Sequence, residues 1–501
     1  MRPTFLKHID TSRQVIVLAI FTLLATNALT PLMSPNGDNA SYIILSESLA
    51  SGKGYINTFY PGEPAETQYP PLLPVLLLPI TILLGQNFFA MKIVALIFGI
   101  LGLIAMFRLL KTMATPDTAW IVTLLTAVNA AYIFFGSSIL TETIYVFLSA
   151  CVLLTIRKIM QTKEDRIGLI LAAAVLIALS FYARTIGATL ALSMCGFLFF
   201  NKRYKASILL ALFIGLLLLP WALRSIQVHN SYFDQLTEKS AGETETGSFI
   251  VLHRLAQNLP RYAGKSFVDL VGGPTIATLT PYNPIKITGS LLLSGLFLFG
   301  FLRNLKSSLT PENAYLIVYL GILSVWPYHD ARFLLPILPL LFYYMIEGLE
   351  HLPIKTDALR QRTLTGVTVV LLLTGIGSSL HLVYFNRTDY YQPEIANFKD
   401  ACTWIKSNAP KEALVISRKP RLSAIWSDRK SWWYTDPTRI PQKDQLGNPI
   451  IVTHVIVTEF PISGVNLGEG FEKMRAATPN RFELLYRTPS PTVSVYALSS
   501  P

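Results

Sequence analysis

The loop that follows the first apolar run reads NGDNASY at residues 36–42, ASGKGY at 50–55 and QYPPLLP at 68–74. Tyr42, Leu45 and Leu49 have i, i+3, i+7 spacing, which predicts a short amphipathic helix that begins near Asn39 and seeks a lipid surface. Two glycines in the second stretch end this helix, and the Tyr-Pro-Pro step returns the chain to apolar sequence. A simple connection needs neither a carboxylate, a lipid-seeking helix nor a rigid return. We therefore interpret this loop as half of an active site, with Asp38 as its acidic residue.

The composition places this loop in a membrane protein. Of the 501 residues, 51% are hydrophobic and 14% are charged, and the mean hydropathy is +0.45. Apolar runs near the length that crosses a bilayer recur up to residue 385, and the first lacks a clear cleavage site, which predicts an uncleaved span. The net charge of +12 comes largely from short loops between spans, so it does not indicate nucleic-acid binding. Three cysteines predict neither a disulfide framework nor a metal cluster.

Eleven spans are predicted, at residues 14–33, 88–109, 117–135, 140–158, 166–184, 186–200, 205–222, 287–303, 313–328, 332–349 and 363–385. The apolar run 71–85 contains three prolines and is short for a span, so we interpret it as an interfacial or re-entrant segment. The basic loops then lie on the same side as the N-terminus. The positive-inside rule accordingly places the N-terminus in the cytoplasm and the C-terminus outside.

The predicted fold is an α-helical polytopic membrane domain over residues 1–388, followed by a small extracytoplasmic α/β domain over residues 389–501. The membrane domain has outer loops at 34–87 and 223–286. In the tail, helices are predicted at 393–408 and 466–478, and strands at 414–417, 450–458, 482–486 and 493–498. The basic run 418–421, with Trp426, Trp432 and Trp433, suits contact with a sugar or an anionic surface; the alternative is a solvated basic turn.

The order of the motifs resembles the GT-C superfamily of polytopic glycosyltransferases, in particular its protein O-mannosyltransferase and lipid A aminoarabinose-transferase-like branch. The resemblance covers residues 14–350 and is carried by Asp38 with Tyr42, Ala50, Gly52 and Tyr55, Tyr69-Pro70-Pro71 with Leu73-Pro74, Thr141-Glu142, Ala183-Arg184, Pro220-Trp221 with Arg224, and Arg332-Phe333-Leu334-Leu335-Pro336 with Pro339. Many relatives have paired acidic residues or Glu-Lys-Pro where this chain has Gly37-Asp38-Asn39 and Gln68-Tyr69-Pro70-Pro71. The donor-phosphate contacts of those relatives are therefore not carried over at these positions.

The resemblance implies transfer of a sugar from a polyprenyl-phosphate donor to an acceptor hydroxyl at the outer membrane surface, with inversion. Such transfer needs a base for the acceptor proton and cations for the phosphate leaving group. Asp38 is the candidate base, and its alternative role is to cap the helix near Asn39. Glu142 is a second candidate, which would orient the acceptor or bind a divalent cation; alternatively it is a favourable charge at a helix N-terminus. The sequence requires no particular cofactor.

Three arginines lie at the outer ends of predicted spans, against the charge bias of the loops. A lone arginine at such a place is usually a snorkelling anchor, but three on one face favour a donor-phosphate role for at least one. Arg332 and Arg224 rank ahead of Arg184, which lies in a short turn between spans. The remaining candidates for the substrate loops are Tyr42, Tyr55, Tyr69, His329 and Asp330, and the last two are alternatively a solvated loop pair.

Two other functions fit the same sequence. A multi-span transporter or flippase of lipid-linked or polar solutes would show internal repeats and polar groups near the midplane, whereas the predicted spans are nearly free of ionisable residues. A non-catalytic assembly protein would use the tail as its working part. The expected partners are the lipid-linked donor, an acceptor that is a lipid, glycan or protein, and membrane lipids.

Overall fold

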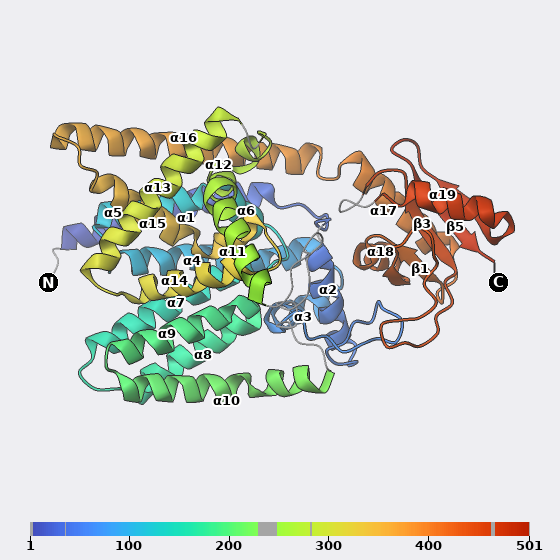
Figure 1. Cartoon of the computed structure of the whole chain (residues 1–501), viewed down its shortest axis with the longest axis horizontal. Helices are drawn as coiled ribbons and strands as arrows, with labels where there is room; N and C mark the ends of the chain where they lie inside the picture. Colours follow the sequence, from blue (N-terminus) through green and yellow to red (C-terminus); the bar gives the residue numbers. More distant parts are fainter. Residues whose placement is uncertain (1–3, 36, 229–247, 281–282, 462–465, 500–501) are drawn as a thin grey trace. The chain divides into compact units, whose positions relative to one another are not determined.

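The computed structural model describes residues 4–35, 37–228, 248–280, 283–461 and 466–499 (Figure 1). These residues form two compact units. The first comprises residues 1–29, 70–72 and 89–387, and the second comprises residues 30–69, 73–88 and 388–501. Asn36 of the first predicted loop, and residues 229–247 and 281–282 of the loop predicted at 223–286, lie outside the described residues.

The first unit is helical, and every predicted span falls on a helix or a bent helix pair. Its helices are α1 (Thr4–Ala28), α4 (Phe88–Leu110), α5 (Pro116–Ala127), α6 (Ala130–Gly136), α7 (Glu142–Gln161), α8 (Ile167–Ala183), α9 (Ala188–Phe200), α10 (Tyr204–Val228), α11 (Ser248–Arg261), α12 (Phe267–Ala277), α13 (Pro284–Ser307), α14 (Pro311–Val325), α15 (Leu338–Glu350) and α16 (Asp357–Thr388). A 3₁₀ segment, η4 (Ala331–Ile337), precedes α15.

Seven helical segments of the described residues are long and apolar enough to cross a membrane, and the α5–α6 pair, bent by 64°, makes an eighth. The bend has a local cause, because the Asn129 side chain accepts a hydrogen bond from the Tyr132 amide and so starts a new helix. The chain is therefore a multi-span membrane protein. The count of eleven crossings and the orientation of the termini stay predictions, because α8, α9 and α14 are shorter apolar helices.

Close packing and one buried ion pair hold the first unit together. A Cβ at Gly300 would collide with the Tyr344 carbonyl, and one at Gly348 with the Leu296 carbonyl, so α13 and α15 pack backbone to backbone. The ion pair joins Arg157, near the C-terminal end of α7, to Glu312, in the first turn of α14. Arg157 Nε and Nη2 donate to the two carboxylate oxygens of fully buried Glu312 at 2.7 and 2.8 Å. This bidentate pair ties α7 to α14.

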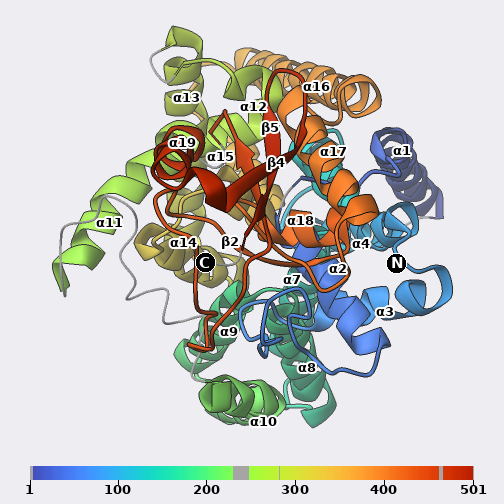
Figure 2. The same ribbon diagram turned by 90° about the vertical axis from the view of Figure 1, so that its right-hand side faces the viewer.

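The second unit contains the α/β tail domain. Its five-stranded sheet has the order β2-β1-β3-β5-β4, with β1 (Leu414–Ser417) parallel to both β2 (Lys430–Trp433) and β3 (His454–Thr458), and with β5 (Val493–Leu498) antiparallel to β3 and to β4 (Phe482–Arg487). Helix α19 (Gly468–Ala477) lies on one side of the sheet, and α17 (Pro393–Asn408) and α18 (Pro420–Ser427) lie on the other (Figure 2). The predicted helices and strands of the tail are confirmed, except that the strand predicted at 450–458 begins only at His454.

Two tail elements, α18 and β2, were not predicted, because their short basic and aromatic sequence suggested a turn. Pro420 occupies the first turn of α18, where its missing amide proton costs nothing, and Asp428, at φ 54°, ends the helix in a left-handed conformation. Residues 430–433 then pair in register with β1. Tertiary pairing therefore makes a strand from a segment whose own sequence signal is weak.

The first outer loop belongs to the second unit and supplies α2 (Gly37–Ala50) and α3 (Leu72–Leu84). The prediction of an amphipathic, lipid-seeking α2 is wrong, because Ser41 through Ser46 are all buried and α2 packs against α18. The helix ends as predicted, before Gly52 and Gly54, which take φ values of 74° and 86°. The Ser431 amide of β2 also donates to the Phe59 carbonyl at 2.8 Å. The assignment of residues 34–87 to a membrane domain at 1–388 stays a prediction, since in the structure most of them pack with the tail.

Candidate functional site

Asp38 lies in the first turn of α2, where the helix dipole favours a carboxylate. The helix begins at Gly37, two residues before the start predicted near Asn39, so Asp38 lies inside the first turn. The capping role of Asp38 stays an alternative prediction. The Oδ1 atom of Asp38 accepts a hydrogen bond from the Tyr69 hydroxyl at 2.7 Å. The side chain of Asp38 remains 28% exposed, so its carboxylate can meet a substrate.

Tyr69 is the centre of this group. Its ring meets the ring of Tyr42 edge to face at 5.4 Å, and its carbonyl accepts a hydrogen bond from the Tyr55 hydroxyl at 2.7 Å. The structure thus joins the other two predicted loop tyrosines to Tyr69, whose hydroxyl contacts Asp38. Glu66, which we did not predict, is buried and accepts a hydrogen bond from the Tyr69 amide at 3.1 Å. A carboxylate three residues before a Tyr-Pro-Pro step is the signal that would have identified it.

Arg421 of α18 completes the group. Its Nη1 atom donates to the Tyr69 hydroxyl at 2.5 Å and lies 3.9 Å from Asp38 Oδ1, and its guanidinium carbon lies 4.9 Å from the centre of the Tyr69 ring. The Arg421 side chain is only 20% exposed, so the solvated-turn alternative is wrong for this residue. Burial raises the pKa of Tyr69 well above its ordinary value; Asp38 raises this pKa further, and Arg421 opposes the rise. Tyr69 therefore stays protonated and able to donate.

Glu142 and Arg184 form a second group, in the first unit. Arg184 Nη1 lies 2.5 Å from Glu142 Oε1, and also donates to the Thr141 hydroxyl at 3.3 Å. Glu142 opens α7 and is fully buried, whereas Arg184 follows the last residue of α8. A carboxylate at such depth needs a cationic partner. The arginine that the sequence ranked last thus pairs with the second candidate catalytic carboxylate.

The other candidates are also in the first unit. Arg224 is half-buried near the end of α10. The backbone amide of Arg332 donates to Asp330 Oδ1 at 2.9 Å, and its guanidinium group lies 3.7 Å from Asp330 Oδ2 and 5.4 Å from the Phe333 ring centre. Asp330 therefore shapes the loop around Arg332.

His329 is half-buried, so it does not fit the solvated loop pair. Its Nε2 atom lies 2.9 Å from Ser266 Oγ, and its ring centre lies 4.5 Å from that of Tyr262. Burial lowers the pKa of His329, and the nearby Arg261 and Lys265 lower it further, against the opposing effect of Asp330. A neutral imidazole is the expected form at neutral pH.

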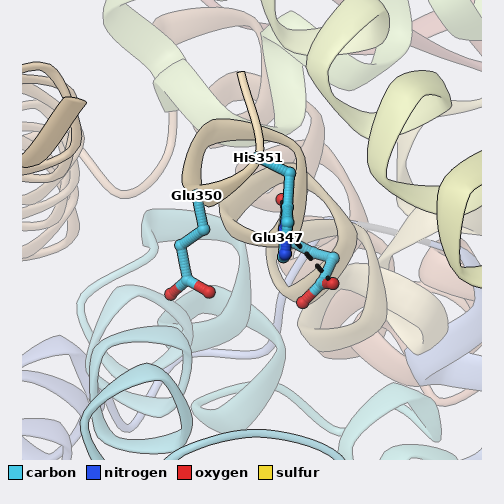
Figure 3. Close-up of side chains that lie close together, drawn as sticks. All are labelled: Glu347, Glu350 and His351. Carbon is cyan, nitrogen blue, oxygen red and sulfur yellow. Dashed lines mark hydrogen bonds and ion pairs between the residues drawn. The ribbon is translucent and has the colours of Figure 1, made fainter. Parts of the chain in front are cut away.

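A divalent cation needs several converging oxygen or nitrogen ligands. Among the described residues, Glu142 belongs to no group of three close His, Cys, Asp or Glu side chains, and its nearest charge is a cation. Such a group does occur at the C-terminal end of α15, where Glu347, Glu350 and the following residue His351 lie close together (Figure 3). Two of its members already have partners, because Glu350 accepts from the Thr118 hydroxyl and His351 Nδ1 lies 2.9 Å from the Glu347 carbonyl oxygen. These contacts suit a helix terminus at least as well as a metal site.

No protein-family model matches the chain, and no curated protein matches it in sequence. Solved structures nevertheless share its fold. ArnT from Cupriavidus metallidurans in the apo state superposes with a TM-score of 0.65 at 12% identity, over 97% of this chain and 98% of that one. ArnT bound to undecaprenyl phosphate gives 0.61 at 12% identity, over 96% and 97%. The apo oligosaccharyltransferase of Archaeoglobus fulgidus gives 0.59 at 14% identity, over 99% and 75%.

These identities establish the fold alone, and the mannosyltransferase-like branch stays a prediction. The superposition covers almost the whole chain, including both the helical unit and the tail domain. The chain therefore has the fold of the GT-C membrane glycosyltransferases.

Proposed function

We propose that this protein is a membrane glycosyltransferase that moves a sugar from a polyprenyl-phosphate donor to an acceptor hydroxyl at the outer membrane surface, with Asp38 as general base. The observation that carries the proposal is the partly exposed carboxylate of Asp38, held by the Tyr69 hydroxyl in the first turn of α2. The fold supports it, since one solved structure of this fold, ArnT, holds undecaprenyl phosphate.

The proposed reaction balances without a redox partner. The acceptor oxygen forms a bond to the anomeric carbon while the bond from that carbon to the phosphate oxygen breaks. The electron pair of the broken bond leaves with the polyprenyl phosphate, and the proton of the acceptor hydroxyl passes to the Asp38 carboxylate. Attack opposite to the leaving group inverts the anomeric carbon. A positioned base of this kind contributes about 10²- to 10⁴-fold to a rate.

The cationic side chains suit the leaving group. Arg332 and Arg224 are our candidates for binding the donor phosphate, because both adjoin the predicted outer loops that would cover the donor and a guanidinium matches phosphate geometry. Arg184 remains a candidate, but its pairing with Glu142 favours a joint role in which the two residues orient the acceptor.

The test is a transfer assay with purified protein in lipid nanodiscs, a panel of radiolabelled polyprenyl-phosphate sugars, and membrane extract as the source of acceptor. We expect one labelled sugar to appear in a product other than the donor, with release of polyprenyl phosphate. The same donors in sealed vesicles test the transporter alternative. Movement of intact donor between leaflets without cleavage of the sugar–phosphate bond would support a flippase and contradict this proposal.

A further inference from the structure

We propose that Arg421, which the C-terminal domain contributes, is a positioning residue for the Asp38 base and acts through the Tyr69 hydroxyl. This inference rests on the function proposed above and adds a residue from outside the region that carries the sequence resemblance. It also gives the tail domain a direct part in the reaction: α18 would set the geometry of the base.

The side chains of Arg421, Tyr69 and Asp38 can form a chain of hydrogen bonds in only one direction, from the arginine to the carboxylate. An arginine side chain has donors and no acceptor, and an ionised carboxylate has acceptors and no donor. Tyr69 Oη therefore accepts from Arg421 Nη1 at 2.5 Å and must give its own proton to Asp38 Oδ1 at 2.7 Å. Without Arg421, the Tyr69 hydroxyl could rotate and accept elsewhere, and Asp38 would lose a fixed donor.

The tail domain contacts the first outer loop on both sides of Asp38 in the sequence, and these contacts fix the loop next to Arg421. On the N-terminal side, Lys419 Nζ donates to the Pro35 carbonyl at 3.3 Å. On the C-terminal side, the Ser431 amide donates to the Phe59 carbonyl at 2.8 Å, and Lys430 Nζ lies 3.1 Å from a carboxylate oxygen of Glu63. Arg421 lies between these contacts, at the first turn of α18.

A purely structural role does not require this side chain. An apolar residue of similar length would fill the space over the Tyr69 ring and avoid the cost of removing a guanidinium from water. Arg421 instead keeps its charge 3.9 Å from the candidate base and its fork directed at the hydroxyl that the base accepts from. Misplacement of a catalytic group by about 1 Å costs on the order of 10²-fold in rate. Loss of the Arg421 side chain should therefore lower the transfer rate by a measurable factor.

The experiment compares transfer kinetics of the full-length wild type with Arg421→Met, Arg421→Lys, Tyr69→Phe and the double variant Arg421→Met/Tyr69→Phe. Tyr69→Phe keeps the ring and removes only the hydroxyl, so it tests the hydrogen bonds from Arg421 through Tyr69 to Asp38 even if Arg421→Met folds poorly. We expect kcat to fall about 10- to 100-fold in Arg421→Met and Tyr69→Phe with little change in the donor KM. Lysine should restore part of the loss. The double variant should be no worse than the poorer single variant, because both changes break the same chain.

Lys430→Met is the matched control, since Lys430 joins the same domain to the same loop through Glu63 but touches neither Asp38 nor Tyr69 in the contacts described. It should keep the wild-type kcat. Normal kcat in both Arg421→Met and Tyr69→Phe, with an inactive Asp38→Asn, would overturn this inference and leave the proposed function standing. Equal losses in Lys430→Met, or additive losses in the double variant, would also overturn it by showing a structural role. A wild type that transfers no sugar would overturn the proposed function itself.

Discussion

At the scale of single residues, the proton-accepting ability of Asp38 can be separated from its size. Asp38→Asn keeps the volume and an oxygen that accepts from Tyr69, but an amide does not take the proton of an acceptor hydroxyl. We expect normal expression and folding, and transfer reduced at least about 100-fold. Initial rates with saturating donor measure this. Glu63→Gln, in the same loop, is the control and should transfer sugar normally. Near-normal turnover of Asp38→Asn would move the base assignment to Glu142.

The Glu142–Arg184 pair predicts an effect on stability as well as on activity. Arg184→Met removes the cation 2.5 Å from a fully buried carboxylate and should destabilise the protein by about 3–5 kcal/mol. Adding Glu142→Gln should recover part of this free energy, because the unpaired charge is then gone. Thermal unfolding in detergent compares the single and double variants. If Arg184→Met unfolds at the wild-type temperature, Arg184 is not the partner that keeps Glu142 charged and buried.

At the scale of elements, α3 tests the predicted topology. A 13-residue helix is about 20 Å long, which is shorter than the hydrocarbon core of about 30 Å, and Pro79 interrupts its hydrogen bonding. We expect it not to cross. In a variant without the native cysteines, Gln86→Cys should react with an impermeant thiol reagent in intact cells, as should Lys411→Cys in the tail. Gln161→Cys, at the C-terminal end of α7, should react only after permeabilisation. Protection of position 86 in intact cells would contradict the eleven-span topology.

At the scale of the whole molecule, the division into two units predicts which residues lose structure together. Phe471 is fully buried in the sheet core, and Phe471→Ala should cost about 3–5 kcal/mol. Because the 30–69 loop packs in the same unit, we expect faster hydrogen exchange in residues 55–69 as well as in β1 to β5, with the first-unit helices unaffected. Leu484→Ala, on an exposed position of the same sheet, is the control. Unchanged exchange in the loop would show that the loop and the tail unfold separately.

The sequence by itself determined the parts of this protein that local pattern encodes. Apolar runs located the predicted spans of the first unit, because a segment in lipid must satisfy its own backbone hydrogen bonds. They did not locate α11 and α12, which lie in the loop predicted at 223–286. Alternation and helical periodicity predicted the sheet and helices of the tail, with α17 and β5 at their observed bounds. The loop with Asp38 and its three tyrosines was recognisable because its members lie within 32 residues of one another.

Only the tertiary structure decided which charges meet. Arg421 reaches Tyr69 across a separation of 352 residues, and Arg184 reaches Glu142 because two helix ends are adjacent in space. No spacing rule predicts such pairs, since they depend on how distant elements pack. The same packing buries α2 against α18, so a helix whose sequence seemed suited to a lipid surface lies inside the second unit. A local pattern reports what a segment can bury, whereas the packing of the whole chain selects the surface that buries it.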